Sequence, residues 1–126
     1  MESLREIANK VNFKSPIDDE THFSLLNFFD KIVATKDLVN SAYQGNYSCT
    51  KHYKTICDRG VNEYNTKHFI SKNIPYLSWT HESNGVKAHL KTEFKEKDTK
   101  YEWFLSHERT TEIYNPRIEI YMVFEW

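Results

Sequence analysis

The sequence is poor in glycine, proline and cysteine, and it has no excess of charge of either sign. Three glycines and three prolines in 126 residues argue against long irregular loops. Two cysteines are fewer than a small secreted fold held by disulfides normally carries. A net charge of −1 lacks the basic excess that a polyphosphate partner requires. The aromatic share of 15% is enough for a packed core and argues against disorder.

Long apolar runs are also missing. The most apolar stretch, Phe23 to Ala34, is interrupted by Asn27, Asp30 and Lys31, so we expect no segment that crosses a bilayer. The first residues have neither the basic start nor the apolar run of a signal peptide. The expected location is therefore cytoplasmic. Lysine exceeds arginine and Asn, Ile, Tyr and Phe are abundant, which is typical of the AT-rich genome of a virus, phage, protist or low-GC bacterium.

The first half of the chain shows helical spacing. Apolar residues from Leu4 to Val11 predict a short amphipathic helix. Ser15-Pro16-Ile17-Asp18 predicts a helix start with Ser15 as the N-cap and Pro16 at the first helical position. The helix that follows is expected to end near Thr35 and to restart through Leu38. Gly45 is the expected stop.

The segment from Cys49 to Lys72 has a weaker pattern. It fits one helical face, with a short hairpin as the alternative. Four residues of zinc-ligand type lie here: Cys49, His52, Cys57 and His68. Their spacing matches no usual zinc pattern, so we expect neither metal nor cofactor and favour buried thiols. A Cys49–Cys57 disulfide and a nucleophilic cysteine next to His52 are alternatives.

The second half alternates between apolar and polar residues. Four such segments predict strands at 77–82, 86–94, 101–108 and 117–126. Each has one apolar face, which is typical of an antiparallel sheet covered on one side. The expected fold is α+β, a single domain of residues 1–126. Its N-terminal helices pack on one face of a four-stranded, mostly antiparallel meander.

Asn84-Gly85 predicts the register of the first hairpin. Both residues suit the positive φ angles of a type I′ turn, so Glu82 should pair with Lys87 and His81 with Ala88. A second turn is expected around Lys97-Asp98, which pairs Phe94 with Tyr101 and Ala88 with His107. That second register also places Glu93 opposite Glu102, which counts against it.

Together the two registers predict a notch in which His81 and His107 flank Ala88. Trp79 lies in the neighbouring row, and Arg109 and Arg117 lie near the same end. Two imidazoles beside guanidinium groups suit an anion or a small polar ligand, or acid–base catalysis. The alternative is that these are ordinary strand-end histidines bonded to nearby loops.

The solvent face of the sheet is expected to carry an apolar patch of Phe104, Tyr121 and Val123. Such a patch favours a protein contact or a dimer face, with scattered surface hydrophobes as the alternative. Basic and aromatic residues on an open sheet also resemble a single-strand RNA reader, but many glutamates share this face. The leading hypothesis is therefore a small intracellular, non-enzymatic interaction module. A ligand pocket is the second hypothesis and nucleic-acid binding the third.

Overall fold

The computed structural model describes residues 18–126, and the helix expected at Leu4 to Val11 lies outside these residues. The described chain contains three α-helices, one 3₁₀ helix and four strands. In chain order these elements are α2 (Asp19–Val33), α3 (Asp37–Tyr43), β1 (Ser48–Cys57), α4 (Thr66–Asn73), η1 (Pro75–Ser78), β2 (Thr80–Ser83), β3 (Val86–Phe104) and β4 (His107–Glu125).

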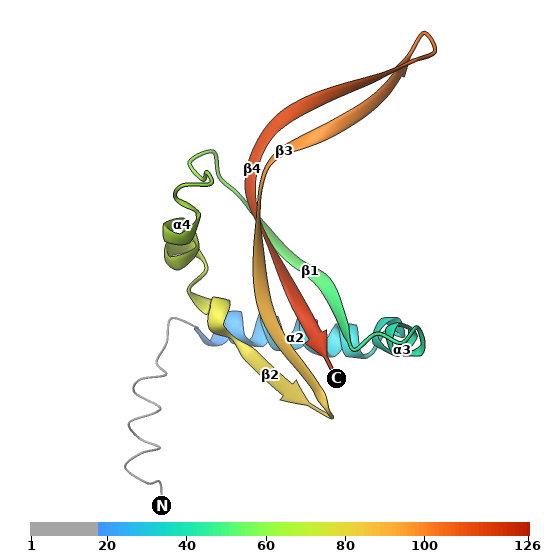
Figure 1. The fold of residues 1–126 in the computed structure, drawn as a ribbon. Coiled ribbons are helices and arrows are strands. Elements are labelled where there is room, and N and C mark those ends of the chain that lie inside the picture. Colours follow the sequence, from blue (N-terminus) through green and yellow to red (C-terminus); the bar gives the residue numbers. More distant parts are fainter. Residues whose placement is uncertain (1–17) are drawn as a thin grey trace, which may run out of the picture.

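The four strands form one antiparallel sheet in the order β1-β4-β3-β2. Strands β2, β3 and β4 form a meander, and β1 pairs with the other edge of β4. The helices pack against one face of this sheet (Figure 1), and α2 runs across it. The expected α+β fold, with N-terminal helices on an antiparallel four-stranded sheet, is confirmed.

The helical half follows the sequence pattern closely, apart from its first residue. Asp18 is the N-cap of α2, because its backbone is extended and its Oδ1 accepts the backbone N–H of Thr21 at 2.7 Å. The helix therefore starts at Asp19, and the predicted cap Ser15 and first position Pro16 lie outside the described residues. The break near Thr35 and the second helix, α3, are as expected, and Gly45 follows with a φ of +85°.

The core lies between the helices and the even-numbered residues of β4. Leu25 and Phe29 of α2 pack in a cluster with Met122 and Phe124, and all four are buried. A second cluster joins Val61 and Ile74 to Ile118 and Ile120. Side chains alternate across a strand, so the odd-numbered residues of β4 from Arg117 to Glu125 lie on the face without helices, which we call the open face.

Residues 48–57 form a strand, and the prediction of a helix there is wrong. Strand β1 pairs with β4 from Ser48↔Glu125 to Cys57↔Arg117, with an irregularity between His52 and Lys54. Pairing with the most buried strand of the sheet outweighs the local helical spacing. Within this sheet Tyr53 points to the helices, where its ring packs edge-on against Phe28 at 5.1 Å.

The first hairpin has the predicted register. His81 pairs with Ala88, Glu82 with Lys87 and Ser83 with Val86, and Asn84 and Gly85 both have positive φ. The ladder begins at Thr80, so Trp79 lies just outside it as the C-cap of η1. The segment before Thr80 is 3₁₀ helix, not strand.

The second hairpin differs from the prediction. Strand β3 continues through Lys97 and Asp98 and turns at Leu105-Ser106, so Phe104 pairs with His107. Ala88 pairs with Phe124, and Phe94 with Ile118. This register keeps the buried residues of β4 on the core face over a long ladder, which outweighs the turn preference of Lys97-Asp98. The segment 101–108 is therefore no separate strand, and β1 is the fourth strand.

Candidate functional site: a projecting hairpin arm

The outer part of the β3–β4 hairpin extends away from the rest of the molecule (Figure 1). Strand β1 follows β4 as far as Arg117, and β2 follows β3 only from Val86 to His89. Beyond an irregularity between Lys95 and Lys97, the described chain has β3 and β4 paired with each other alone. We call residues 97–114 the arm. Its strands extend about 25 Å beyond this irregularity.

The two faces of the arm differ in composition. Tyr101 and Trp103 share one face with Tyr114, which pairs with Lys97. Lys100, Glu102 and their partners Thr111 and Arg109 lie on the other face. Lys100 Nζ is 2.8 Å from the Glu102 carboxylate. We call the first the aromatic face, although it also carries Glu108 and the Lys97–Glu112 ion pair at 3.5 Å. We call the second the charged face, which also carries Ile113 opposite Asp98.

The apolar residues of the arm face solvent. Exposed fractions are 77% for Trp103, 79% for Leu105 and 68% for Tyr101. Ile113 and Tyr114 are also exposed. None of these five belongs to either core cluster. Several exposed apolar side chains gathered on one projecting element are typical of a contact surface.

The tip of the arm has an unfavourable turn. Leu105 and Ser106 have φ angles of +49° and +66°, the same region that Asn84 occupies in the first hairpin. A residue other than glycine, asparagine or aspartate in this region costs about 1–2 kcal/mol. The turn therefore places a strained and exposed leucine at the far end of the molecule.

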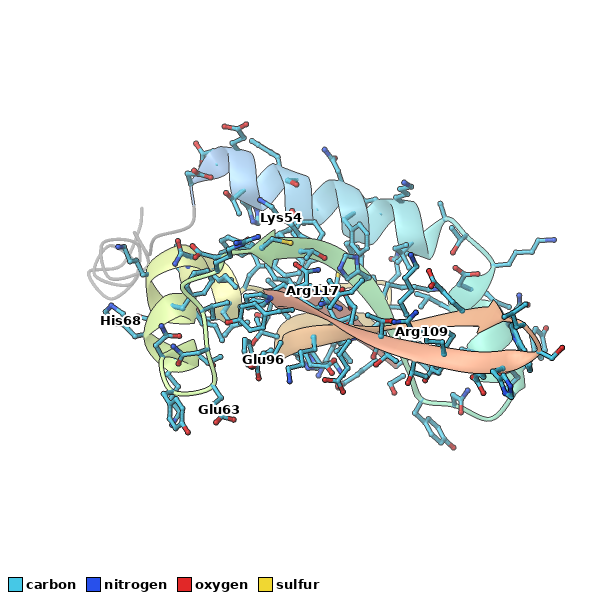
Figure 2. The ribbon with its side chains drawn as sticks, turned by 90° about the horizontal axis from the view of Figure 1, so that it is seen from above. Lys54, Glu63, His68, Glu96, Arg109 and Arg117 are labelled. Atoms are coloured by element: carbon cyan, nitrogen blue, oxygen red, sulfur yellow. The ribbon has the colours of Figure 1, made fainter. Side chains whose placement is uncertain are left out.

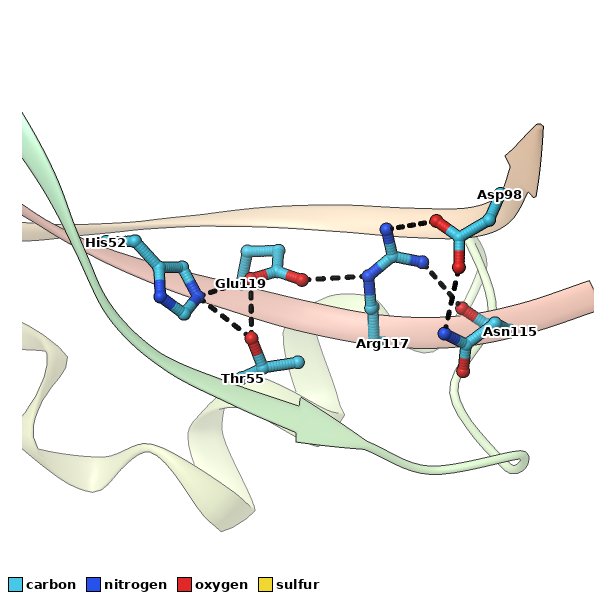
Figure 3. A network of polar contacts seen from close by, with 6 residues as sticks. All are labelled: His52, Thr55, Asp98, Asn115, Arg117 and Glu119. Atoms are coloured by element: carbon cyan, nitrogen blue, oxygen red, sulfur yellow. Dashed lines mark hydrogen bonds and ion pairs between the residues drawn. The ribbon is translucent and has the colours of Figure 1, made fainter. Parts of the chain in front are cut away.

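A polar network on the open face holds the base of the arm (Figure 3). Arg117 lies at its centre, where Nε donates to Glu119 at 2.8 Å and Nη2 donates to Asp98 of the arm at 2.6 Å. Asn115 donates to the second oxygen of Asp98 at 3.0 Å. Beyond Glu119 the network continues to β1, since Thr55 donates to Glu119 Oε2 at 2.6 Å and His52 Nε2 lies 2.5 Å from the same oxygen. Three strands are thus joined where the arm begins.

Electrostatics favour the charged forms in this network. Burial alone would raise the pKa of Glu119, but the hydrogen bonds from Thr55, Arg117 and His52 outweigh it and lower the pKa. A hydrogen bond from Asn115 and the Arg117 guanidinium lower the pKa of Asp98. Glu119 and Asp98 raise the pKa of Arg117. The charged forms of Glu119, Asp98 and Arg117 therefore stabilise one another.

The predicted His81–His107 notch is not formed. His81 is half-buried at the body, where its ring stacks on Trp79 and meets Phe29 edge-on at 4.7 Å. His107 lies at the tip of the arm, at the other end of a 19-residue strand about 60 Å long. The notch fails because the turn lies at Leu105-Ser106. A polar hollow of about 460 Å³ does lie beside Ala88, but its second histidine is His89, which faces Glu125 at 3.6 Å.

The three other predicted ligand residues are also apart. Trp79 is buried in the core, and its Nε1 donates to His22 Nδ1 at 3.1 Å. Arg109 pairs with Glu102 on the arm, whereas Arg117 belongs to the network at the base. The labels in Figure 2 show the two arginines at different places along the hairpin.

The predicted patch of Phe104, Tyr121 and Val123 is divided. Phe104 lies at the tip and pairs with His107, whereas Tyr121 and Val123 pair with Lys91 and His89 in the body. Val123 is buried, between strands on both sides. Tyr121 is half-buried, with the Lys91 ammonium 5.6 Å from its ring centre. The open face of the body therefore offers less apolar surface than expected, and the arm offers more.

The cysteines and histidines of the zinc-type segment are scattered. Cys49 and Cys57 lie at opposite ends of β1, about 25 Å apart, which excludes the disulfide. Cys49 packs against the core, whereas His52 lies on the open face and His68 on α4 (Figure 2). The buried-thiol prediction is wrong for Cys57, which is exposed. Residues 18–126 contain no cluster of three or more His, Cys, Asp or Glu side chains suited to a metal ion.

Sequence reasoning missed both the arm and its base. The signal for the arm is the alternation of Thr99, Tyr101 and Trp103 with charged residues, which starts directly at Lys97-Asp98 and argues against a turn there. The signal for the network is the pair Arg117 and Glu119, opposite charges two residues apart on one strand face.

Comparison with protein-family models, curated proteins and solved structures finds no match. No helix within residues 18–126 has the length and apolar character needed to span a membrane.

Proposed function

We propose that this chain is a non-enzymatic, intracellular protein-interaction module whose contact element is the arm. The observation that carries the proposal is the exposure of Tyr101, Trp103 and Leu105 on an element that contributes nothing to the core. Aromatic side chains are enriched at protein interfaces and supply much of the binding energy there. The network at the base supports the proposal, because a contact element held in a fixed direction loses less entropy on binding.

A protein partner fits the arm better than a nucleic acid. The arm carries three basic residues, Lys97, Lys100 and Arg109. It also carries four acidic ones: Asp98, Glu102, Glu108 and Glu112. This balance gives no attraction for a phosphate backbone, whereas paired opposite charges around aromatic residues are typical of a protein contact.

Site-specific photo-crosslinking tests the proposal. A photoreactive amino acid replaces Trp103 on the arm or, as the matched control, Tyr64 on the body, which is 90% exposed. Each protein is irradiated both when purified and in an extract of the cells that encode it. We expect discrete protein adducts from position 103 and only background from position 64. Equal yields from both positions, or none from position 103 in either setting, would contradict the proposal.

A further inference from the structure

We infer that the partner of the arm is a second copy of this chain. The two arms pair antiparallel along their β3 edges about a two-fold axis at Tyr101, which joins two ribbons into one four-stranded sheet. This inference rests on the proposed function, because it names the partner for the same surface.

The β3 edge of the arm is open for such pairing. From Lys97 to Phe104, β3 has β4 as its strand neighbour and no other within residues 18–126. The two residues that flank a two-residue hairpin turn, here Phe104 and His107, hydrogen-bond to each other across the ladder. Along an antiparallel ladder, every second pair is hydrogen-bonded in this way, and the residues between them direct their backbone groups outward. Thr99, Tyr101 and Trp103 therefore direct their backbone N–H and C=O groups to the free edge. An edge of this kind is a template for another strand.

Charge selects the register. A two-fold axis at Tyr101 places Lys100 opposite Glu102 of the partner, and Glu102 opposite Lys100 of the partner. An axis at Lys100 would oppose two lysines. An axis at Thr99 would pair Asp98 with Lys100 of the partner, but it would also place Glu96 opposite Glu102 of the partner. The Tyr101 axis brings opposite charges together and no like charges.

The same register extends both faces of the arm. On the charged face, Arg109 pairs with Glu102 within the chain, so the row continues as Arg109, Glu102 and Lys100 of the partner with alternating sign. On the aromatic face, Tyr101 meets Tyr101 of the partner, and Trp103 lies diagonal to it. The exposed aromatic residues of the two arms then form one continuous strip.

The β4 edge of the arm does not offer this match. Antiparallel pairing about a two-fold axis at Thr110 would place Glu108 opposite Glu112 of the partner. An axis at Arg109 would oppose two arginines, and an axis at Thr111 pairs no opposite charges. The β3 edge is therefore the one that fits a second copy.

The length of the arm also fits. With the axis at Tyr101, Leu105 of one copy lies opposite Lys97 of the other, so each tip reaches the base of the partner's arm. The helices and the other strands lie on the body side of Lys97 (Figure 1). In the antiparallel dimer the two bodies would therefore occupy opposite ends of the joint.

Charge-reversal variants of the full chain test the inference by sedimentation equilibrium. We expect a wild-type dimer, and self-association weaker by about tenfold or more for Lys100→Glu or Glu102→Lys alone, because each variant then opposes like charges across the joint. In a mixture, the Lys100→Glu chain has acidic residues at positions 100 and 102, and the Glu102→Lys chain has basic residues at both positions. Each acidic residue of the first chain then faces a basic residue of the second. A heterodimer of near wild-type affinity should therefore form. The rescue also shows that both variants are folded.

A pair of proline variants identifies the edge. Tyr101→Pro blocks an outward N–H on the β3 edge, and Thr110→Pro does the same on the β4 edge, directly across the ladder. We expect the first to be monomeric and the second to dimerise like the wild type. Equal effects of the two prolines would overturn the inference.

A monomeric wild-type chain, or a mixture of Lys100→Glu and Glu102→Lys that stays monomeric, would also overturn the inference. Crosslinks from position 103 to a different protein, with a monomeric wild-type chain, would overturn the second copy as partner and leave the interaction function standing. Absence of any arm-specific crosslink would contradict both the second copy as partner and the proposed interaction function.

Discussion

Two turns in this sheet share a backbone geometry but have opposite residue preferences. Asn84-Gly85 contains residues that adopt positive φ at little cost, whereas Leu105-Ser106 does not. The strained pair lies at the tip of the arm and the relaxed pair at the edge of the body. At the scale of single residues, Leu105 and Ser106 adopt a backbone conformation that their side chains disfavour, as residues at functional sites often do.

Replacing Leu105-Ser106 by Asn-Gly should relieve this strain. We expect amide hydrogen exchange in the arm to slow by a factor corresponding to about 1–2 kcal/mol, because the turn no longer opposes the ladder. The reverse change, Asn84→Leu with Gly85→Ser, is the matched control and should speed exchange in β2. Unchanged exchange in both variants would show that the turns carry no such strain.

Glu119 is the most buried charged group described in the network, and it faces Glu93 across the ladder. Glu119→Gln should lower the free energy of unfolding by about 1–3 kcal/mol, since Arg117 and His52 lose their charged acceptor. Glu93→Gln on the same face is the control. It should change stability by less than about 0.5 kcal/mol, because Glu93 is exposed. Urea unfolding of both variants measures the difference, and equal effects would contradict the role of the network.

The carboxylates of Glu119 and Asp98 make the free energy of unfolding depend on pH. The pKa values of Glu119 and Asp98 are lowered on folding, so their contribution is complete above the ordinary values of 4.5 and 3.8 and is lost as the pH falls through the lower folded values. The wild-type free energy of unfolding should therefore fall more steeply with acid than that of Glu119→Gln. Urea unfolding at a series of pH values below neutrality tests this, and parallel curves would count against it.

At the scale of elements, one hairpin serves two purposes. Its inner part supplies Ala88, Leu90, Met122 and Phe124 to the core, while its outer part supplies none. The irregularity between Lys95 and Lys97 and the network around Arg117 mark the boundary. The hairpin is therefore a structural element up to this point and a free contact element beyond it.

Removal of the arm should leave the body folded. Asp98 pairs with Ile113, so residues 99–112 can be replaced by Asn-Gly to give a shorter two-residue hairpin that keeps the network. We expect the free energy of unfolding to change by less than about 1 kcal/mol, because no core residue is lost. Urea unfolding followed by circular dichroism checks this. Loss of a cooperative transition would show that the body depends on the arm.

The elements that sequence predicted are those that local chemistry specifies. Asn84-Gly85 defined its hairpin because two residues are sufficient for a type I′ turn, and the breaks at Thr35 and Gly45 are equally local. The turn at Leu105-Ser106 was not predicted, because its residues oppose the conformation they adopt. β1 was not predicted because its pairing with β4 is a long-range choice. The predicted notch failed with the turn on which it depended.

At the scale of the molecule, two core clusters share their borders. Tyr53, Tyr76 and Leu77 pack against both clusters, so α2 and α4 cover one continuous core. This continuity predicts a single cooperative unit for the described chain.

Phe29→Ala tests this unit. The substitution removes a buried ring and should lower the free energy of unfolding by about 3–5 kcal/mol, with fluorescence and circular dichroism shifting together. Phe23→Ala on the same helix is the control and should have a small effect, because Phe23 is 62% exposed. Two separate transitions in Phe29→Ala would indicate that the clusters unfold independently.

The arm also changes how the molecule moves through solution. A compact chain of 126 residues has a radius of gyration of about 14 Å, and the arm adds about 25 Å of thin ribbon on one side. Frictional drag follows length more than mass, so the monomer should diffuse slowly and elute early from a sizing column. Two copies joined through their arms would tumble as a long rod with a body at each end. Strongly anisotropic rotational diffusion would therefore indicate that the arms are joined.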